Sequence, residues 1–107
     1  MEQLFETYER ARLYFEMRDP AEAARILEPL AEEQPGNRSV IELLGRAYYH
    51  SAQLSRAEAT FRRLVELDPC NAWAHEVLAR TLERQSRADE AAPFRKLALA
   101  MGGKTAF

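Results

Sequence analysis

The chain has 107 residues, of which 47% are hydrophobic and 30% are charged, with only 4 Gly and 5 Pro. This length and composition indicate one helix-rich globular domain of modest size, and they exclude a disordered chain or a second catalytic domain. The formal net charge of −2 gives no electrostatic reason to expect nucleic acid or a membrane surface as the main partner. No apolar run approaches the ~20 residues that cross a bilayer.

The first predicted unit covers residues 4–37 and contains two helices. Pro20 falls in the first turn of the second helix, where its missing N–H has no partner to lose. Pro29 falls near the middle of that helix and removes the hydrogen bond to the carbonyl of Arg25. We therefore expect a bend at Pro29.

The second predicted unit, residues 38–71, shows helical spacing most clearly. Its apolar residues step by three and four positions in two sets: Ile41, Leu44, Ala47 and Tyr48, then Ala57, Thr60, Phe61, Leu64 and Leu67. The polar stretch 50–56 between the sets is short enough to join antiparallel helices. In the turns that flank this unit, proline ends one helix and asparagine is suited to cap the next, as in Pro35 with Asn37 and Pro69 with Asn71.

The third predicted unit covers residues 72–101, with a short polar stretch at 85–88 between its helices. Pro93 falls in about the first turn of the last helix, so we expect that helix to start late. Residues 102–107 contain two glycines and are expected to form a flexible tail, so the domain is predicted to span 1–101.

An internal repeat of 34 residues runs through all three units. Small residues recur where helices must approach closely, large apolar residues recur where space must be filled, and proline recurs where a helix must stop. The matching positions are Ala11, Gly45 and Ala79; Tyr14, Tyr48 and Leu82; Ala23, Ala57 and Ala91; Leu30, Leu64 and Ala98; Pro35 and Pro69; and Asn37 and Asn71.

This pattern resembles the tetratricopeptide repeat family. The second unit matches it at Leu44, Gly45, Tyr48, Ala57, Phe61, Leu64 and Pro69, with Ile41 in place of the usual tryptophan. The third unit departs from it at Arg95, where a large apolar residue is usual. The resemblance implies an all-α fold, an α-solenoid of three antiparallel helix pairs in a right-handed superhelix. It also implies that the first helix of each pair lines a concave groove.

If this chain has the groove that the resemblance implies, the first helix of each pair lines it. The residues predicted to bind a partner are Tyr8, Arg12, Leu43, Arg46, Tyr49, Trp73, Val77 and Arg80. Other residues expected on the same surface are Phe5, Glu9, Phe15, Glu42, Glu76 and Arg84. Aromatic side chains here could form a ligand platform, although some of them, Phe15 in particular, could equally pack between helices.

The arginines Arg12, Arg46 and Arg80 are spaced by one repeat and should line up along the groove over roughly 20 Å, enough for about six extended residues. They could hold a carboxylate or a backbone carbonyl. Alternatively, Glu42 with Arg46 and Glu76 with Arg80 stand four residues apart and could simply pair in water. Arg12 is the better ligand candidate, since Tyr8 rather than an acid stands four residues before it.

One subset of the resembling family grips C-terminal carboxylates of chaperones with lysine, asparagine and arginine side chains. The corresponding positions here are Tyr8, Arg12, Leu43, Trp73 and Val77. Only Arg12 among them could serve, so we expect a partner of another kind.

The sequence lacks the convergent reactive groups of an enzyme. His75 stands where the repeat usually carries a packing tryptophan, and we expect it to be a core or interface histidine. The two histidines and Cys70 have no metal-ligand spacing, and no glycine loop suits a phosphate, so neither a metal nor another cofactor is expected. The single cysteine and the absence of a signal-like N-terminus indicate a cytoplasmic protein.

The predicted function is therefore a non-catalytic adaptor or scaffold that holds a protein or peptide in its groove. One alternative is self-association, including a homodimer, through apolar residues of the last helix such as Leu97 and Met101, with Phe107. The net charge is −5 in residues 1–37, +1 in 38–71 and +2 in 72–107, a distribution that would allow a head-to-tail contact. A regulatory subunit that works beside a catalytic chain is the other alternative.

Overall fold

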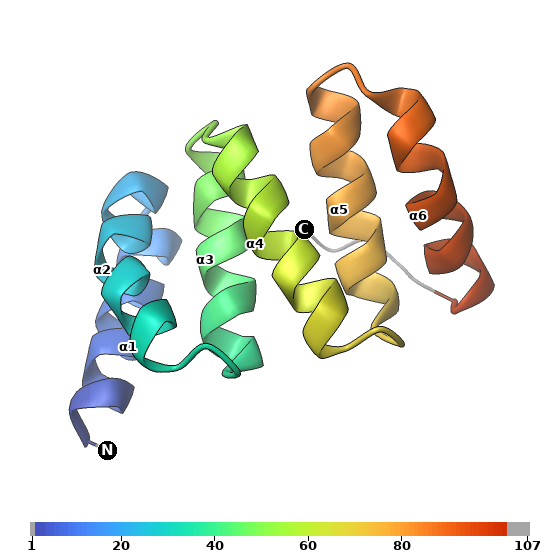
Figure 1. Cartoon of the computed structure of the whole chain (residues 1–107). Coiled ribbons are helices and arrows are strands. Elements are labelled where there is room, and N and C mark those ends of the chain that lie inside the picture. The colour runs from blue at the N-terminus through green and yellow to red at the C-terminus, as the bar shows by residue number, and fades with distance from the viewer. Residues whose placement is uncertain (1, 103–107) are drawn as a thin grey trace.

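The computed structural model describes residues 2–102, which form six α-helices and no strand. The helices are α1 (Glu2–Glu16), α2 (Pro20–Glu33), α3 (Arg38–His50), α4 (Leu54–Leu67), α5 (Ala72–Arg84) and α6 (Ala88–Ala100). Figure 1 shows the three antiparallel pairs in a row, with α1 and α2 at one end and α6 at the other. Each helix packs mainly on its neighbours in sequence, and α1 also contacts α3. The prediction of an all-α solenoid of three helix pairs is confirmed.

The turn within each pair has the same backbone geometry. Arg18, Ala52 and Ser86, spaced by 34 residues, adopt positive φ angles of 65°, 61° and 62°. In each turn the next N–H donates to a carbonyl five residues back, for example from Gln53 to Tyr48 at 2.8 Å. This left-handed cap reverses the chain at the end of each first helix. A non-glycine residue there costs about 1–2 kcal/mol, so packing of the pair must hold the turn in place.

The turns between pairs are capped as predicted. The side-chain oxygens of Asn37 and Asn71 accept hydrogen bonds from Val40 N and Ala74 N, each at 3.2 Å. Each cap satisfies one of the N–H groups that a helix start leaves unpaired.

Three prolines lie within helices, Pro20 and Pro29 in α2 and Pro93 in α6. Pro20 is the first residue of α2, where it is tolerated. Pro29 lies inside α2, which continues to Glu33, and the bend at Pro29 remains a prediction. The late start expected for the last helix is wrong, because α6 begins at Ala88 and contains Pro93. Fully buried Ala91 anchors its first turn, and Pro93 is exposed, so its ring faces solvent.

The core runs without interruption through all three pairs. The small residues Ala23, Ala57 and Ala91 are completely buried, one in each second helix. In the middle pair, Gly45 of α3 lies directly against the ring of Phe61 of α4. At these positions each first helix packs against the second helix of its own pair. The opposite side of the first helix therefore has no contact within that pair.

Of the predicted tail, 102–107, only Gly102 lies within the described residues. No helix between residues 2 and 102 is long and apolar enough to cross a membrane.

Candidate functional site

The structure places most of the predicted groove residues on one surface, which we call the first-helix face because α1, α3 and α5 supply it. Six of the eight are accessible to solvent there: Tyr8, Arg12, Arg46, Tyr49, Trp73 and Arg80. Leu43 and Val77 are instead buried in the core, with exposures of 3% and 0%, so their prediction as contact residues is wrong. The reason is that α3 and α5 are each covered on two flanks by neighbouring helices, which widens their apolar face beyond one stripe.

Five side chains from three helices form a continuous basic aromatic cluster: Phe15, Arg46, Tyr49, His50 and Arg84. The His50 ring meets those of Phe15 and Tyr49 edge-on, with centroids 5.7 Å and 5.3 Å away. The guanidinium of Arg46 lies 4.8 Å from the Phe15 centroid, and that of Arg84 lies 4.7 Å from the Tyr49 centroid. Arg84 Nη1 also donates to Tyr49 O at 3.2 Å. Cations over aromatic faces stabilise both partners while leaving the outer guanidinium surface usable.

The three repeat-spaced arginines are not equivalent. Arg12 pairs with two glutamates of its own helix, Glu9 at 2.9 Å and Glu16 at 3.1 Å, so it is not the best ligand candidate. Arg80 pairs with Glu76 at 3.1 Å, as the structural alternative predicted. That alternative is wrong for Arg46.

Within residues 2–102 Arg46 makes no salt bridge, although its charge partly offsets the rise in the pKa of Glu42 that burial causes, and its buried Nε has no hydrogen-bond partner. Arg46 borders a hollow of about 400 Å³ between the α1–α2 turn and α3. The hollow is lined by Phe15, Arg18, Pro20, Arg46 and His50. Arg18 is likewise without an ion pair within the described part of the chain. The hollow therefore combines two arginines, and no acidic residue lines it.

Two further hollows lie along the first-helix face. One, of about 290 Å³, lies between the N-terminal halves of α1 and α3 and includes Phe5 and Tyr8. The other, of about 420 Å³, borders Tyr49, Arg80 and Arg84 near the C-terminal end of α5. Such shallow, partly aromatic depressions are typical of surfaces that receive side chains of a partner.

The third hollow is bounded by a charge network around Glu76, which is only 3% exposed. Arg95 of α6 donates to both carboxylate oxygens of Glu76, at 2.9 Å and 2.8 Å, and also binds Glu83 at 2.7 Å. This explains the departure from the family pattern at Arg95, since an apolar residue there would leave Glu76 with Arg80 alone among these cations. Phe94, one position earlier, packs against the core instead.

Burial shifts the pKa of several groups on this face. The pKa of His50 is lowered, first by burial and then by the positive charges of Arg46 and Arg84, which favours the neutral ring. Burial raises the pKa of Glu42, and Arg46 only partly opposes that effect. Burial and the charge of Glu42 raise the pKa of Tyr8.

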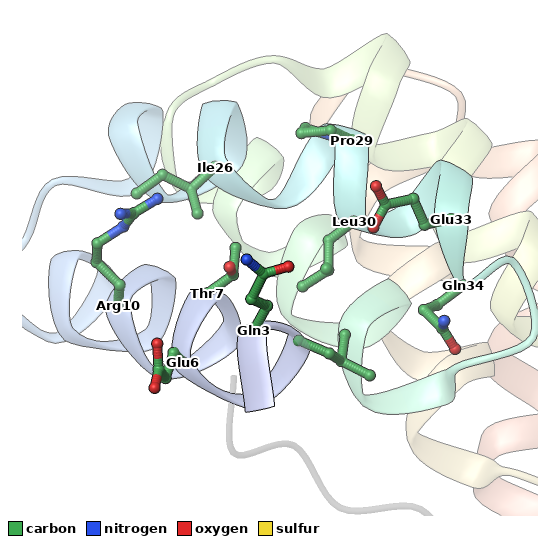
Figure 2. A pocket seen from close by; sticks show the side chains of 10 residues that line it. Gln3, Glu6, Thr7, Arg10, Ile26, Pro29, Leu30, Glu33 and Gln34 are labelled. Atoms are coloured by element: carbon green, nitrogen blue, oxygen red, sulfur yellow. The ribbon is translucent and has the colours of Figure 1, made fainter. Parts of the chain in front are cut away.

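A larger hollow, of about 720 Å³, lies elsewhere, between α1 and α2. Figure 2 shows Gln3 and Thr7 of α1 and Ile26 and Leu30 of α2 around this space. None of the predicted partner-binding residues lines it. The buried side-chain atoms that lack a partner in residues 2–102 are also elsewhere, on Arg46 and His75. We therefore regard the first-helix face as the candidate site.

The residues considered for chemistry are dispersed. His75 is buried, and its Nε2 donates to Pro69 O at 2.8 Å while its ring stacks on Phe94, as expected of a packing histidine. Cys70 is an exposed free thiol. Between residues 2 and 102, no three or more histidine, cysteine or acidic side chains gather as a metal site would require.

Two residues of the cluster region were not predicted, His50 and Arg18. His50 was interpreted as part of a turn, but it is the last residue of α3. Arg18 is placed by its left-handed backbone angle, which a sequence pattern does not reveal for arginine. One sequence feature could have pointed to this cluster. Phe15 and Tyr49 occupy the same repeat position, so aromatic residues recur near the C-terminal ends of the first helices.

Comparisons with known proteins agree with this architecture. A profile of the tetratricopeptide repeat family matches residues 14–70, and a second profile with the same description matches residues 43–104. The chain belongs to the tetratricopeptide repeat family. It is thus a repeat module of the kind that supports interactions between proteins. A search of curated proteins finds no match.

Solved structures share the fold at low sequence identity. MamA from Desulfovibrio magneticus RS-1 superposes with a TM-score of 0.84 at 22% identity, over 90% of this chain and 54% of that one. A variant of MamA gives 0.88 at 24% identity, over 94% and 74% of the two chains. A chain of the CopN-Scc3 complex gives 0.90 at 17% identity, over 99% of this chain and 62% of that chain. This chain therefore spans little more than half of some of these proteins, and the likeness shows the fold alone.

Proposed function

We propose that the protein is a non-catalytic adaptor that holds an extended segment of a partner polypeptide along the first-helix face. The observation that carries the proposal is the basic aromatic cluster. Its five side chains come from α1, α3 and α5 and contact one another across helix boundaries. A ligand that lies across the three helices would therefore meet a preformed surface, which lowers the entropic cost of binding.

The shape and chemistry of the face support a peptide rather than a small metabolite. Hollows separated along the face can receive successive side chains, while arginines between them can bind carbonyl or carboxylate oxygens. The neighbour from the CopN-Scc3 complex is named for an assembly of two proteins, which is in keeping with a role in protein binding. The proposal places the protein in the cytoplasm, where its exposed free Cys70 would remain reduced.

The test begins with partners captured from an extract of the source cells by the immobilised protein. The affinity of each purified partner is then measured for the wild type, for Trp73→Ala and for the triple variant in which Arg12, Arg46 and Arg80 become Ala. We expect a loss of at least about tenfold for both, because aromatic and arginine side chains dominate interface energies.

Arg25→Ala is the matched control, since Arg25 lies on α2, has a side chain that is 71% exposed and pairs with Glu22 of its own helix. It should leave the affinity unchanged. Equal affinities for the wild type, Trp73→Ala and the triple variant would contradict the proposal.

A second candidate function is self-association through α6, as the sequence also suggested. Leu97, Leu99 and Met101 are 43%, 68% and 39% exposed. Leu99 stands one repeat after Val65, which packs against the core, so α6 exposes a position that α4 covers. Light scattering across a dilution series tests this candidate. A dimer that Leu99→Lys converts to a monomer would support it, and a monomer at high concentration would remove it.

A further inference from the structure

We propose that one hollow of the first-helix face binds a carboxylate of the partner, and that Arg46 makes the principal contact with it. The hollow is lined by Phe15, Arg18, Pro20, Arg46 and His50. This inference rests on the proposed function and assigns the chemical group that this part of the face recognises. None of the five positions that correspond to the chaperone-tail clamp lines this hollow.

The Arg46 side chain has an unsatisfied hydrogen-bond donor. Its Nε is buried and has no hydrogen-bond partner within residues 2–102. A buried donor without an acceptor destabilises the free protein, and an acceptor that reached it would remove that cost. The Phe15 ring, 4.8 Å from the guanidinium carbon, holds the planar group in place from one side. The guanidinium edge thus remains as the surface for a ligand.

The acidic residues nearest in sequence lie outside the lining of the hollow. Glu16 pairs with Arg12 at 3.1 Å, and Asp19 caps α2 by accepting from Glu22 N at 3.2 Å. Glu42 is partly buried, and its charge acts on Tyr8 and on Arg46, although no salt bridge joins Glu42 to Arg46 within the described residues. No acidic residue lines the hollow, whereas both Arg18 and Arg46 do. The local field therefore attracts an anion.

The lining favours a carboxylate among anions. A guanidinium binds a carboxylate through two parallel N–H···O bonds. Phe15 and Pro20 supply apolar walls, so the residue next to the carboxylate should be uncharged. A volume of about 400 Å³ lies within the range of sites that hold a small ligand group. Both a chain terminus and an Asp or Glu side chain carry this chemistry.

The test is an NMR titration of the isotope-labelled protein with four probes: N-acetyl-alanyl-alanine, its C-terminal amide, N-acetyl-aspartate amide and inorganic phosphate. We expect one or both carboxylate probes to shift the Arg46 Nε–Hε resonance and the backbone amides of Phe15 and His50. The neutral alanyl amide should produce no shift. The stronger of the two carboxylate probes identifies the source, a chain terminus or an acidic side chain.

Substitutions of Arg46 test whether this residue binds the carboxylate. Arg46→Gln should weaken carboxylate binding at least about tenfold, and Arg46→Lys should lie between it and the wild type, because lysine keeps the charge but not the planar fork. Arg25→Gln should match the wild type. The subsite is refuted if neither carboxylate probe shifts these resonances, if the alanyl amide or phosphate binds as strongly as the carboxylates, or if Arg46→Gln binds normally. The wild-type and Arg46→Lys titrations decide the question even if Arg46→Gln does not fold.

Failure of the carboxylate subsite can be distinguished from failure of the adaptor proposal. A partner that loses affinity for Trp73→Ala but not for Arg46→Gln would support groove binding and overturn the subsite. Carboxylate probes that bind at Arg46, with partners indifferent to the first-helix face, would support the subsite as an anion site and overturn the adaptor proposal.

Discussion

Gly45 lies so close to Phe61 that a Cβ atom on it would fall within 3.0 Å of three atoms of the phenyl ring. The Phe61 ring is completely buried. It lies against Gly45 of α3, and the centroid of the Trp73 ring is 5.9 Å from its own. Phe61 therefore has little room to move, and the separation of α3 and α4 depends on the absence of a side chain at position 45.

Gly45→Ala should destabilise the protein by about 1–3 kcal/mol, because overpacking outweighs the better helix propensity of alanine. One repeat earlier the corresponding residues are Ala11 and Leu27, both fully buried. The double variant Gly45→Ala with Phe61→Leu should therefore recover part of the loss, which thermal denaturation can measure. Gly36→Ala is the control, since nothing lies within 4 Å of its Cβ position. Additive effects of the two substitutions would contradict the steric coupling.

Removing the prolines inside helices should stabilise the protein. Pro29 and Pro93 are exposed, and each leaves a carbonyl one turn earlier without its helical partner. Pro29→Ala and Pro93→Ala should each raise the free energy of unfolding in urea, by up to about 3 kcal/mol. Pro20→Ala should change it little, because Pro20 is the first residue of α2. A loss of stability in Pro29→Ala would show that the proline has a packing role.

Two glutamates should affect stability with opposite sign. Burial raises the pKa of Glu42 above its ordinary value of 4.5, so the ionised form is disfavoured in the folded state. Glu42→Gln should therefore be more stable than the wild type at pH 7, and the difference should vanish below about pH 4.5.

Burial alone would raise the pKa of Glu58, but hydrogen bonds from Arg87, Gln85 and Arg62 hold it below its ordinary value. Its ionised form thus stabilises the fold above about pH 4.5, and this contribution is lost as the pH falls through the lowered pKa. Glu58→Gln should be less stable than the wild type at pH 7, with a gap that narrows in acid. Melting temperatures from pH 3 to 8 test both glutamates, and equal signs for the two variants would contradict the assignment.

Arg95 should matter more for stability than its partial exposure suggests. Arg95→Ala removes two hydrogen bonds from buried Glu76 and should cost about 1–3 kcal/mol. Lys96→Ala, at the next and exposed position of α6, should have little effect. Chemical denaturation compares them, and a neutral Arg95→Ala would show that Arg80 alone satisfies Glu76.

Most of the architecture could be predicted because each repeat follows the same local rules. Proline, asparagine and small residues recur at 34-residue spacing, and the caps at Asn37 and Asn71 formed where expected. The burial of Leu43 and Val77 was missed because helical periodicity predicts one apolar face, whereas α3 and α5 have neighbours on two sides. The unpaired state of Arg46 was also missed, since a spacing of four permits an ion pair with Glu42 but does not require one.

The most direct test of partner binding on the first-helix face is to map backbone amide shifts as a purified partner is added. We expect the perturbed residues to concentrate on the accessible sides of α1, α3 and α5, with Tyr49, His50 and Trp73 among them, and to spare α2, α4 and α6. Perturbations concentrated on the outer faces of α2 and α4, or on Leu97 and Leu99 of α6, would contradict it.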